Sequence, residues 1–399
     1  MTEAALLDGA HALSDKIVAL RRAIHAEPEL GLHTPLTRDK VRAALAHLPL
    51  TWREGPSTTG LVATLEGGAG AGRTVLLRGD MDALAMPEET GLAFASTIPG
   101  RMHACGHDTH TAMLAGAAEL LCARRETLAG RVQFMFQPGE EGHHGARFMI
   151  EDGLIDPVPD AAFALHIMPD SPHGLVAGRA GALMASADQF VIAVEGRGGH
   201  ASMPHQTRDP VPVACEIVTA IQAMVTRKFA VADPVVVTVA RIEAGTAHNV
   251  IVDRATLTGT MRTLSCDNRE RLPTELERLA THIAAAHDLI ATVRIERGFP
   301  VTVCDERAVA LGEAVTGELV GPERFVRLAH PIMGAEDFSY VLEKTPGAMF
   351  FLGVSHQGDD WRQCCGIHSA RMMVDESVMP LGTAVLAGRA VRFLEKGFA

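Results

Sequence analysis

The sequence predicts an α/β protein in which helices flank a mostly parallel sheet and a smaller α+β sandwich is inserted into the chain. Four short, continuously apolar runs end in polar residues, with helical stretches between them, as in buried strands of a parallel sheet. From about Ser186 the apolar and polar residues alternate instead, which indicates strands with one exposed face. A chain of 399 residues is long enough for two such domains.

The first domain is predicted from its apolar runs, which are TVLLRGDMD (74–82), RVQFMFQPGEEG (131–142), DAAFALHIMPD (160–170) and AMFFLGVS (348–355). Residues 1–25 are expected to form an amphipathic helix with Leu13, Ile17, Leu20 and Ile24 on one stripe. Another helix is expected in the stretch where Met113, Leu114, Ala117, Leu120 and Leu121 occur at helical spacing. In such sheets ligands bind outside the carboxyl ends of the strands, where the polar residues of these runs lie.

The inserted domain is predicted from its order of elements. A strand begins at about Ser186 and a helix follows over 210–225. The remaining expected strands cover 234–245, 255–264 and 291–297, with a helix between the last two, and 298–306 is expected to be the returning linker. The predicted domains are therefore 1–185 with 299–399, and 186–298.

The composition excludes several classes of function. A net charge of −12 argues against a nucleic-acid or membrane-surface partner, because both need a basic face. The start of the chain lacks the layout of a signal peptide, and no run is long and apolar enough to span a bilayer. Seven scattered cysteines fit buried thiols in a reducing compartment. We therefore expect a cytoplasmic protein.

The segment GRMHACGHDTH (100–110) concentrates three histidines, a cysteine and an aspartate. Cys105 and His107 are two residues apart, so they share a side only in an extended or looped segment. A helix is expected to begin only after Asp108, which leaves both side chains able to reach one metal ion as thiolate and imidazole. Taken alone, the segment also fits a buried free cysteine beside surface histidines.

Further candidate ligands follow other predicted strands. Glu140 and Glu141 end an apolar strand and point to opposite sides, so one can bind a metal while the other faces a substrate as a base. A solvated acidic turn is the alternative for this pair alone. His166 lies at a third strand end, and His368 lies in CCGIHSARM. Five candidate ligands on separate segments favour a metal site over unrelated structural roles.

Seven motifs occur in one order over nearly the whole chain, namely GRMHACGHDTH, QPGEEG, LHI, GRGGHASMPH, AGTAHNVI, GTMRT and MGAEDFSY. In this order they resemble the dinuclear-metal amidohydrolases that include hippurate hydrolase, N-acyl-L-amino-acid amidohydrolases and plant hydrolases of auxin–amino-acid conjugates. Carboxypeptidase G is similar but more distant. The specific signal is MHACGHD with a following glutamate pair, because the pattern HxCxH alone is not distinctive.

The resemblance implies a role for each matching residue. The metal ligands would be Cys105, His107, Glu141, His166 and His368. Glu140 would be the general base, and His200 would polarise the scissile carbonyl, often from the partner subunit. Asn249 and Arg262 would meet the substrate, and Asp82 would orient a ligand histidine.

The resemblance also implies a reaction and its partners. Two divalent ions per subunit, Mn, Zn, Co or Ni, would activate a water that hydrolyses the amide bond of an N-acyl amino acid. The residues 1–185 and 299–399 would form the catalytic domain, and 186–298 would form a lid or dimerisation domain. The active form would be a homodimer or a higher homo-oligomer.

The sequence departs from the family at two places near these residues. HSARMMVDESV lacks the proline and aromatics that follow the last histidine in many relatives, and QPGEEGHHGA carries a histidine pair where small residues are usual. Both departures bear on substrate preference rather than on the ligand set. Asp80 and Asp108 lie beside the predicted site, and Asp80 is compatible with a structural role.

Three other functions are weighed against this one. A cysteine hydrolase using Cys105 and His107 would leave Glu140, Glu141 and the other histidines without a role. A non-catalytic metal-binding or structural protein would not need the base Glu140. A carboxypeptidase or dipeptidase of the same family is the alternative within the enzyme class.

Overall fold

The computed structural model describes residues 3–398, which form two compact units. The described first unit covers 3–183, 303–330 and 337–398, and the second covers 184–302 and 331–336. Residues 331–336, predicted in the first domain, join the second unit because the Ala185 backbone N–H lies 3.1 Å from the carbonyl of Ile332 and 2.9 Å from that of Gly334. Met1 and Thr2 of the predicted first helix, and Ala399, lie outside the described residues.

A mixed, mostly parallel sheet forms the centre of the first unit. Its strands are β1 (Thr51–Glu54), β2 (Leu61–Glu66), β3 (Thr74–Asp80), β4 (Arg131–Gln137), β5 (Ala161–Met168), β6 (Val176–Gly178), β15 (Phe325–Arg327) and β16 (Gly347–Gly353). They are ordered β1-β2-β4-β3-β5-β16-β6-β15. The four predicted apolar runs are the adjacent parallel strands β4, β3, β5 and β16. Their carboxyl ends therefore meet at one edge.

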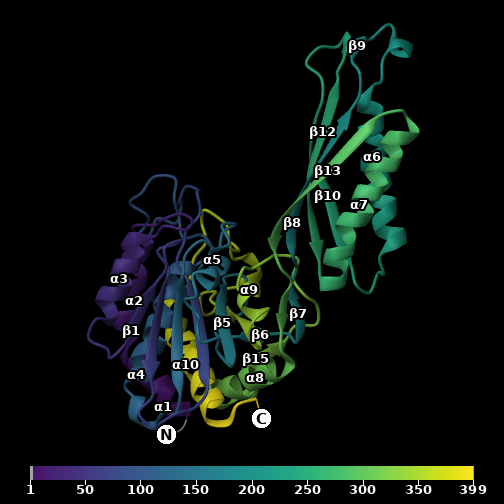
Figure 1. Cartoon of the computed structure of the whole chain (residues 1–399). Helices are drawn as coiled ribbons and strands as arrows, with labels where there is room; N and C mark the ends of the chain where they lie inside the picture. The colour runs from purple at the N-terminus through teal and green to yellow at the C-terminus, as the bar shows by residue number, and fades with distance from the viewer. Residues whose placement is uncertain (1–2, 399) are drawn as a thin grey trace. The chain divides into compact units, whose positions relative to one another are not determined.

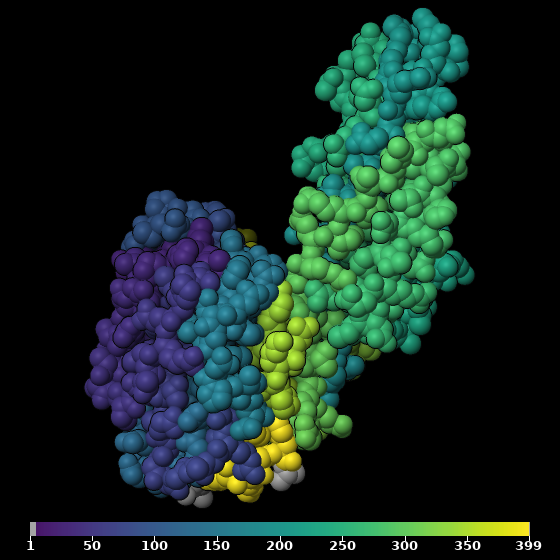
Figure 2. All heavy atoms as spheres, in the orientation of Figure 1, coloured from purple at the N-terminus to yellow at the C-terminus, as the bar shows by residue number. Residues whose placement is uncertain are grey.

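Helices cover this sheet (Figure 1). They are α1 (Glu3–Ala12), α2 (Ser14–His25), α3 (Pro35–Leu45), α4 (His107–Cys122), α5 (Gly145–Glu151), α8 (Glu306–Val320), α9 (Ser339–Leu342) and α10 (Met379–Lys396). The N-terminal helices, coloured purple, also form part of the surface of this unit (Figure 2). Within residues 3–398, none of the helices combines the length and apolar composition that a bilayer-spanning segment needs.

Two predicted helix boundaries differ from the structure. The N-terminal helix is broken at Leu13, whose backbone N–H bonds to the carbonyl of Ala10 in a tighter turn, although Ile17 and Ile24 face the core as expected. The helix α4 begins at His107 rather than after Asp108. Gly106 makes this start possible because it adopts φ 84°, and a Cβ at this position would lie 2.5 Å from Ile167.

The second unit contains an antiparallel sheet packed against two helices. Its strands β8 (Ala187–Glu195), β10 (Val235–Glu243), β12 (Arg254–Thr263) and β13 (Ile290–Phe299) are ordered β10-β12-β8-β13. The helices are α6 (Pro210–Lys228) and α7 (Cys266–Ala286), and a short pair is formed by β9 (Gly199–His200) and β11 (Val250–Ile251). The chain passes between the units at β7 (Gly181–Met184), at β14 (Thr302–Cys304) and at the two ends of the segment 331–336.

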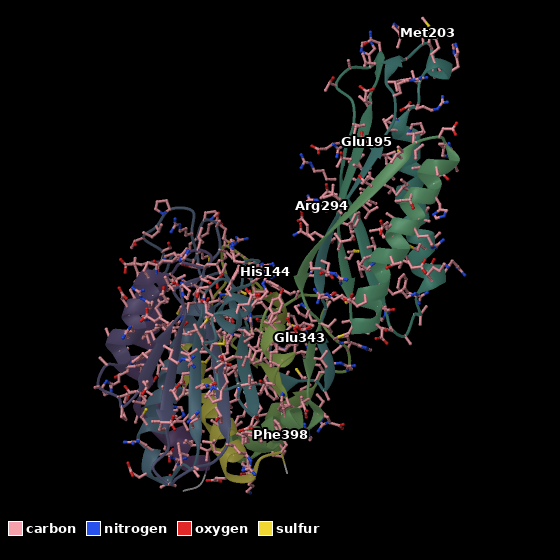
Figure 3. All side chains as sticks on the ribbon, in the orientation of Figure 1. His144, Glu195, Met203, Arg294, Glu343 and Phe398 are labelled. Carbon is pink, nitrogen blue, oxygen red and sulfur yellow. The ribbon has the colours of Figure 1, made fainter. Side chains whose placement is uncertain are left out.

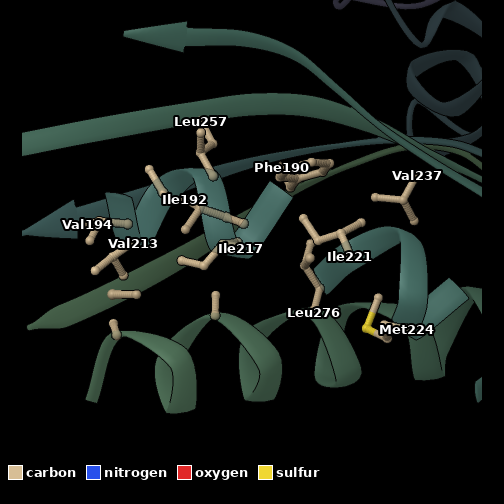
Figure 4. Close-up of a cluster of buried hydrophobic side chains, with 14 of the residues drawn as sticks. Phe190, Ile192, Val194, Val213, Ile217, Ile221, Met224, Val237, Leu257 and Leu276 are labelled. Carbon is tan, nitrogen blue, oxygen red and sulfur yellow. The ribbon is translucent and has the colours of Figure 1, made fainter. Parts of the chain in front are cut away.

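The core of the second unit lies between its sheet and its helices (Figure 4). Phe190 and Ile192 of β8 pack with Leu257 of β12 and with Ile217 and Leu276 of the helices, and all five are buried. The alternating pattern of the sequence therefore corresponds to a sheet with one face buried against helices. The predicted linker 298–306 is partly strand, because β13 continues to Phe299.

Candidate metal centre

The carboxyl ends of β3, β4 and β5 carry the polar residues of the site. Asp80 ends β3 and Asp82 follows it, Glu140 and Glu141 follow β4, and His166 lies in β5. These strands are parallel neighbours. The topology therefore explains why residues far apart in the sequence meet here.

Cys105, His107 and His166 form a buried cluster whose ligand atoms lie within 4.8 Å of one another. The sulfur of Cys105 lies 3.4 Å from Nε2 of His166. Each histidine donates its Nδ1–H to a backbone carbonyl, His107 to Asp82 at 2.8 Å and His166 to Ile167 at 2.6 Å. Because a carbonyl can only accept, the lone pair of each neutral ring is on Nε2, which in His166 faces the Cys105 thiol.

Cys105 also belongs to a second group, with Glu141 and His368. His368 Nε2 lies 3.3 Å from Oε1 of Glu141. The backbone N–H of His368 donates to the carbonyl of Ala104 at 2.7 Å, which fixes this late segment beside Cys105. A third group joins Glu140 and Glu141 to His107. The structure therefore brings together the five predicted ligands and the predicted base.

The side chain of Asp82 holds the two glutamates in place. Its Oδ1 accepts the backbone N–H of Glu140 and its Oδ2 that of Glu141, each at 3.0 Å. Oδ1 also lies 3.5 Å from Nδ1 of His107. Asp82 thus contacts the glutamate pair as well as His107, the predicted ligand.

Asp80 and His110 lie beside His107 but are occupied by other partners. His110 donates Nδ1–H to Oδ1 of Asp80 at 2.6 Å, and its Nε2 accepts the backbone N–H of Ile167 at 2.8 Å. The other oxygen of Asp80 binds the guanidinium of Arg78. Burial alone would raise the pKa of Asp80, but Arg78, His107 and His110 hold it well below its ordinary value. These contacts assign Asp80 a structural role.

Sequence reasoning missed the rest of this buried network. Arg78 Nη2 lies 3.0 Å from Oδ1 of Asp337, and its Nε donates to Gln137 at 2.8 Å. Asp337 also accepts the backbone N–H of Ala146 at 2.9 Å. An arginine inside the apolar run TVLLRGD was the available signal, since a buried cation requires an anionic partner. The network fixes the ends of β3 and β4 under the site.

The histidine pair of QPGEEGHHGA lies at the start of α5. His143 is exposed, whereas Nδ1 of His144 lies 2.9 Å from the hydroxyl of Tyr340 (His144 is labelled in Figure 3). His144 has φ 59°, a conformation that glycine adopts more easily. His144 is therefore a side chain with a defined partner at a position where the resemblance implies a small residue.

The residues of the cluster fit divalent ions. Nε2 of His107 is buried and has no hydrogen-bond partner among residues 3–398. Burial raises the pKa of the Cys105 thiol against the opposing effect of His107, and contacts with Cys105 and Glu141 raise the pKa of His368 to about 10. A bound cation would take the place of these protons. Thiolate, imidazole and carboxylate together suit Zn, Mn, Co or Ni.

The other predicted site residues lie in the second unit. His200 in β9 pairs with Val250, and the Ala201 backbone N–H donates to the carbonyl of Asn249 at 3.0 Å, so His200 and Asn249 are neighbours. Their end of the unit is marked by Met203 in Figure 3. Arg262 lies eight residues along β12 from Arg254, the residue that pairs with the end of β8 near this loop. At about 3.3 Å per residue, this is roughly 26 Å.

Comparison with known proteins agrees with this arrangement. Residues 76–391 match the model of peptidase family M20/M25/M40. The chain belongs to this family. It is therefore a metallo-hydrolase that acts on amide bonds, and the resemblance read from its motifs is confirmed.

Several relatives are similar over nearly the whole length. IAA-amino acid hydrolase ILR1-like 4 of Arabidopsis thaliana is 38% identical over 95% of this chain and 86% of its own. Thermostable carboxypeptidase 1 of Saccharolobus solfataricus is 37% identical over 96% and 97%. N-acetylcysteine deacetylase of Bacillus subtilis is 34% identical over 96% and 98%.

A solved structure shares the fold. The YXEP protein of Bacillus subtilis, a dinuclear metal-binding peptidase of the M20 family, has a TM-score of 0.83 and 32% identity over 96% of this chain and 99% of its own. This match confirms the predicted fold class.

Proposed function

We propose that the protein hydrolyses the amide bond of N-acyl amino acids and that Glu140 is its general base. The cluster of Cys105 with the surrounding histidines and glutamates carries the proposal. It combines the predicted metal ligands with Glu140, a carboxylate that is not one of those ligands. The relatives that act on amino-acid conjugates or on N-acetylcysteine, by their names, support the substrate class.

The ions would be held by five residues, namely Cys105, His107, Glu141, His166 and His368. Cys105 takes part in two of the groups, so its thiolate is suited to serve two neighbouring ions. When bound, divalent ions supply a Lewis acid for the carbonyl and lower the pKa of a water molecule. The hydrogen bonds from His107 and His166 to backbone carbonyls keep both Nε2 atoms ready to bind.

Glu140 would move the proton of the reaction. Its backbone is fixed by Asp82, and its side chain is almost completely buried. The carboxylate would accept a proton from the attacking water and pass it to the nitrogen of the leaving amino acid. Glu141, fixed by the same aspartate, would remain a ligand.

His200 would polarise the scissile carbonyl. The backbone N–H of Ser202 donates to Nδ1 of His200 at 3.1 Å, so in the neutral ring the proton is on Nε2. An exposed Nε2–H is the donor that a developing oxyanion needs. Arg262 would bind the carboxylate of the amino acid, and no hydrogen bond or ion pair holds its side chain within residues 3–398.

The active form would be a dimer. Arg262 lies roughly 26 Å along β12 from Arg254, which pairs with Glu195 at the end of β8 from which the chain continues to His200. An N-acyl amino acid with a small acyl group is much shorter than this. If both side chains contact one substrate, they come from different subunits, with His200 and Asn249 supplied by the partner.

A carboxypeptidase is the second candidate, and the similarity to thermostable carboxypeptidase 1 supports it. The two activities share the residues of the metal cluster and differ in the acyl side of the substrate. An N-acyl amino acid ends in a simple acyl group there, whereas a peptide continues with a further amino group.

The test is a hydrolysis screen on purified protein that has been chelated and reloaded with Mn, Zn, Co or Ni. Matched pairs of substrates, such as N-acetyl-methionine and alanyl-methionine, vary only the acyl side. We expect higher kcat/KM for the N-acyl compounds. A consistent preference for the dipeptides would transfer the assignment to a peptidase, and no hydrolysis of either by metal-loaded protein would refute both.

A further inference from the structure

The last turn of α2 brings cationic side chains to buried carboxylates beside the metal cluster. Arg21 Nε lies 3.0 Å from Oδ2 of Asp108, and His25 Nδ1 lies 2.8 Å from the same oxygen. The side chains of Arg21, His25 and Asp108 are at most 2% exposed. A buried charge lowers the stability of the folded protein unless it has a partner of opposite charge. Loss of one of these side chains would therefore leave another without its partner. Asp108 directly follows the predicted ligand His107.

Arg21 also reaches a second segment that carries a predicted ligand. Its Nη1 lies 2.7 Å from Oε1 of Glu376, eight residues after His368. Arg22 binds the same carboxylate at 2.6 Å. One guanidinium therefore joins the start of α4, which begins at His107, to the chain that follows His368. A planar fork with five donors can make both contacts at once.

His25 fixes the loop that leads to Cys105. Its Nε2 lies 3.1 Å from Oε1 of Glu88, and the other oxygen of Glu88 accepts the backbone N–H of Ser96 at 2.7 Å. The same loop is tied to the residue after α2, because the backbone N–H of Thr97 donates to the carbonyl of Ala26 at 2.8 Å. These contacts tie the loop between β3 and Cys105 to the end of α2.

We infer that Arg21 and His25 are positioning residues that hold the segments of Cys105, His107 and His368 at the spacing the ions require. This inference rests on the proposed metal-dependent function. Neither residue belongs to the ligand groups found in residues 3–398, so both would act through Asp108, Glu88 and Glu376.

The test compares Arg21→Lys with Arg269→Lys. Arg269 binds both oxygens of Asp188 at 2.9 Å, so its replacement disturbs a similar arginine–aspartate pair that belongs to the second unit. The readouts are the dissociation constant of Co²⁺, measured by competition with a chelator, and the thiolate-to-cobalt absorption. A lysine cannot span Asp108 and Glu376, so we expect Arg21→Lys to weaken Co²⁺ binding about 10-fold and to shift the absorption.

Arg269→Lys is expected to lower the melting temperature without changing either readout. Glu376 is the more exposed of the two carboxylates that Arg21 contacts, so Glu376→Gln provides a milder variant if Arg21→Lys does not fold. It should also weaken Co²⁺ binding. If Arg21→Lys or Glu376→Gln keeps the Co²⁺ affinity and absorption of the wild type while Cys105→Ser loses Co²⁺ binding, this inference is wrong. The proposed function would then still stand. Equal Co²⁺ binding by wild type and Cys105→Ser would overturn the proposed function and this inference with it.

Discussion

The carboxylate of Asp82 accepts the backbone N–H of Glu140 at 3.0 Å. Its second oxygen accepts the N–H of Glu141 at the same distance. One buried side chain therefore sets the positions of the predicted base and of a predicted ligand. Because both backbone N–H groups are bonded to Asp82, neither glutamate can move toward the position of the other without breaking one of these bonds. Each can therefore keep its own role.

Asp82→Asn tests this relationship. The amide retains one acceptor and turns a donor toward the other N–H, so one glutamate loses its support. We expect kcat to fall about 10-fold to 100-fold, with weaker metal binding. Asp152→Asn is the matched control, because Asp152 accepts the backbone N–H of Ser57 at 3.0 Å in the same unit. Equal effects of the two substitutions on kcat would show that Asp82 acts only on stability.

The two glutamates are expected to fail in different ways. Glu140→Gln should keep its metal but lose turnover by about 1,000-fold, because an amide cannot accept the proton of water. Glu141→Gln should instead reduce metal content, since an amide is a weaker ligand than a carboxylate. Elemental analysis and steady-state kinetics of both variants check this. Reversed phenotypes would exchange the two roles.

The contribution of His25 to stability should depend on pH. Burial alone would lower its pKa, but Asp108 and Glu88, against the repulsion of Arg21, raise it to about 9. Its ordinary pKa is about 6.5, so the stabilisation is complete below pH 6.5 and is lost as pH rises through 9; the shift corresponds to about 3 kcal/mol. Glu88, with a pKa lowered to about 2, adds stability above pH 4.5 that is lost as pH falls.

The measurement is the free energy of unfolding of wild type and His25→Gln between pH 5 and 10, both without metal. The difference between them should be largest near pH 5 to 6.5 and should shrink toward pH 9. A difference that is constant over this range would mean that folding does not change the pKa of His25.

Much of the fold and of the metal cluster could be predicted because the signals are local. The strand of TVLLRGDMD and the pair Glu140–Glu141 are each visible within one short segment. The buried pair of Arg78 and Asp337 could not be predicted, because 259 residues separate the partners. The same holds for His25 and Asp108, since an amphipathic pattern shows which side of a helix is buried but not which anion it meets.

His200 is expected to act in catalysis rather than in folding. It is exposed, and within residues 3–398 its ring forms hydrogen bonds only with Ser202. His200→Ala should therefore lower kcat by about 100-fold or more while melting and metal content stay nearly unchanged. Subunit exchange with Glu140→Gln should restore part of the activity if His200 serves the partner's site. If a verified heterodimer showed no recovery of activity, His200 would either act within its own chain or have no catalytic role.

The most direct measurement is the metal content of the purified protein and of Cys105→Ser, determined by elemental analysis after loading with Mn, Zn, Co or Ni and removal of free ions. We predict two ions per chain in the wild type, loss of hydrolysis on chelation with recovery on reloading, and a reduced content in Cys105→Ser, whose thiolate belongs to two of the groups. Unchanged metal content in Cys105→Ser, or hydrolysis that persists in fully chelated wild type, would contradict the account.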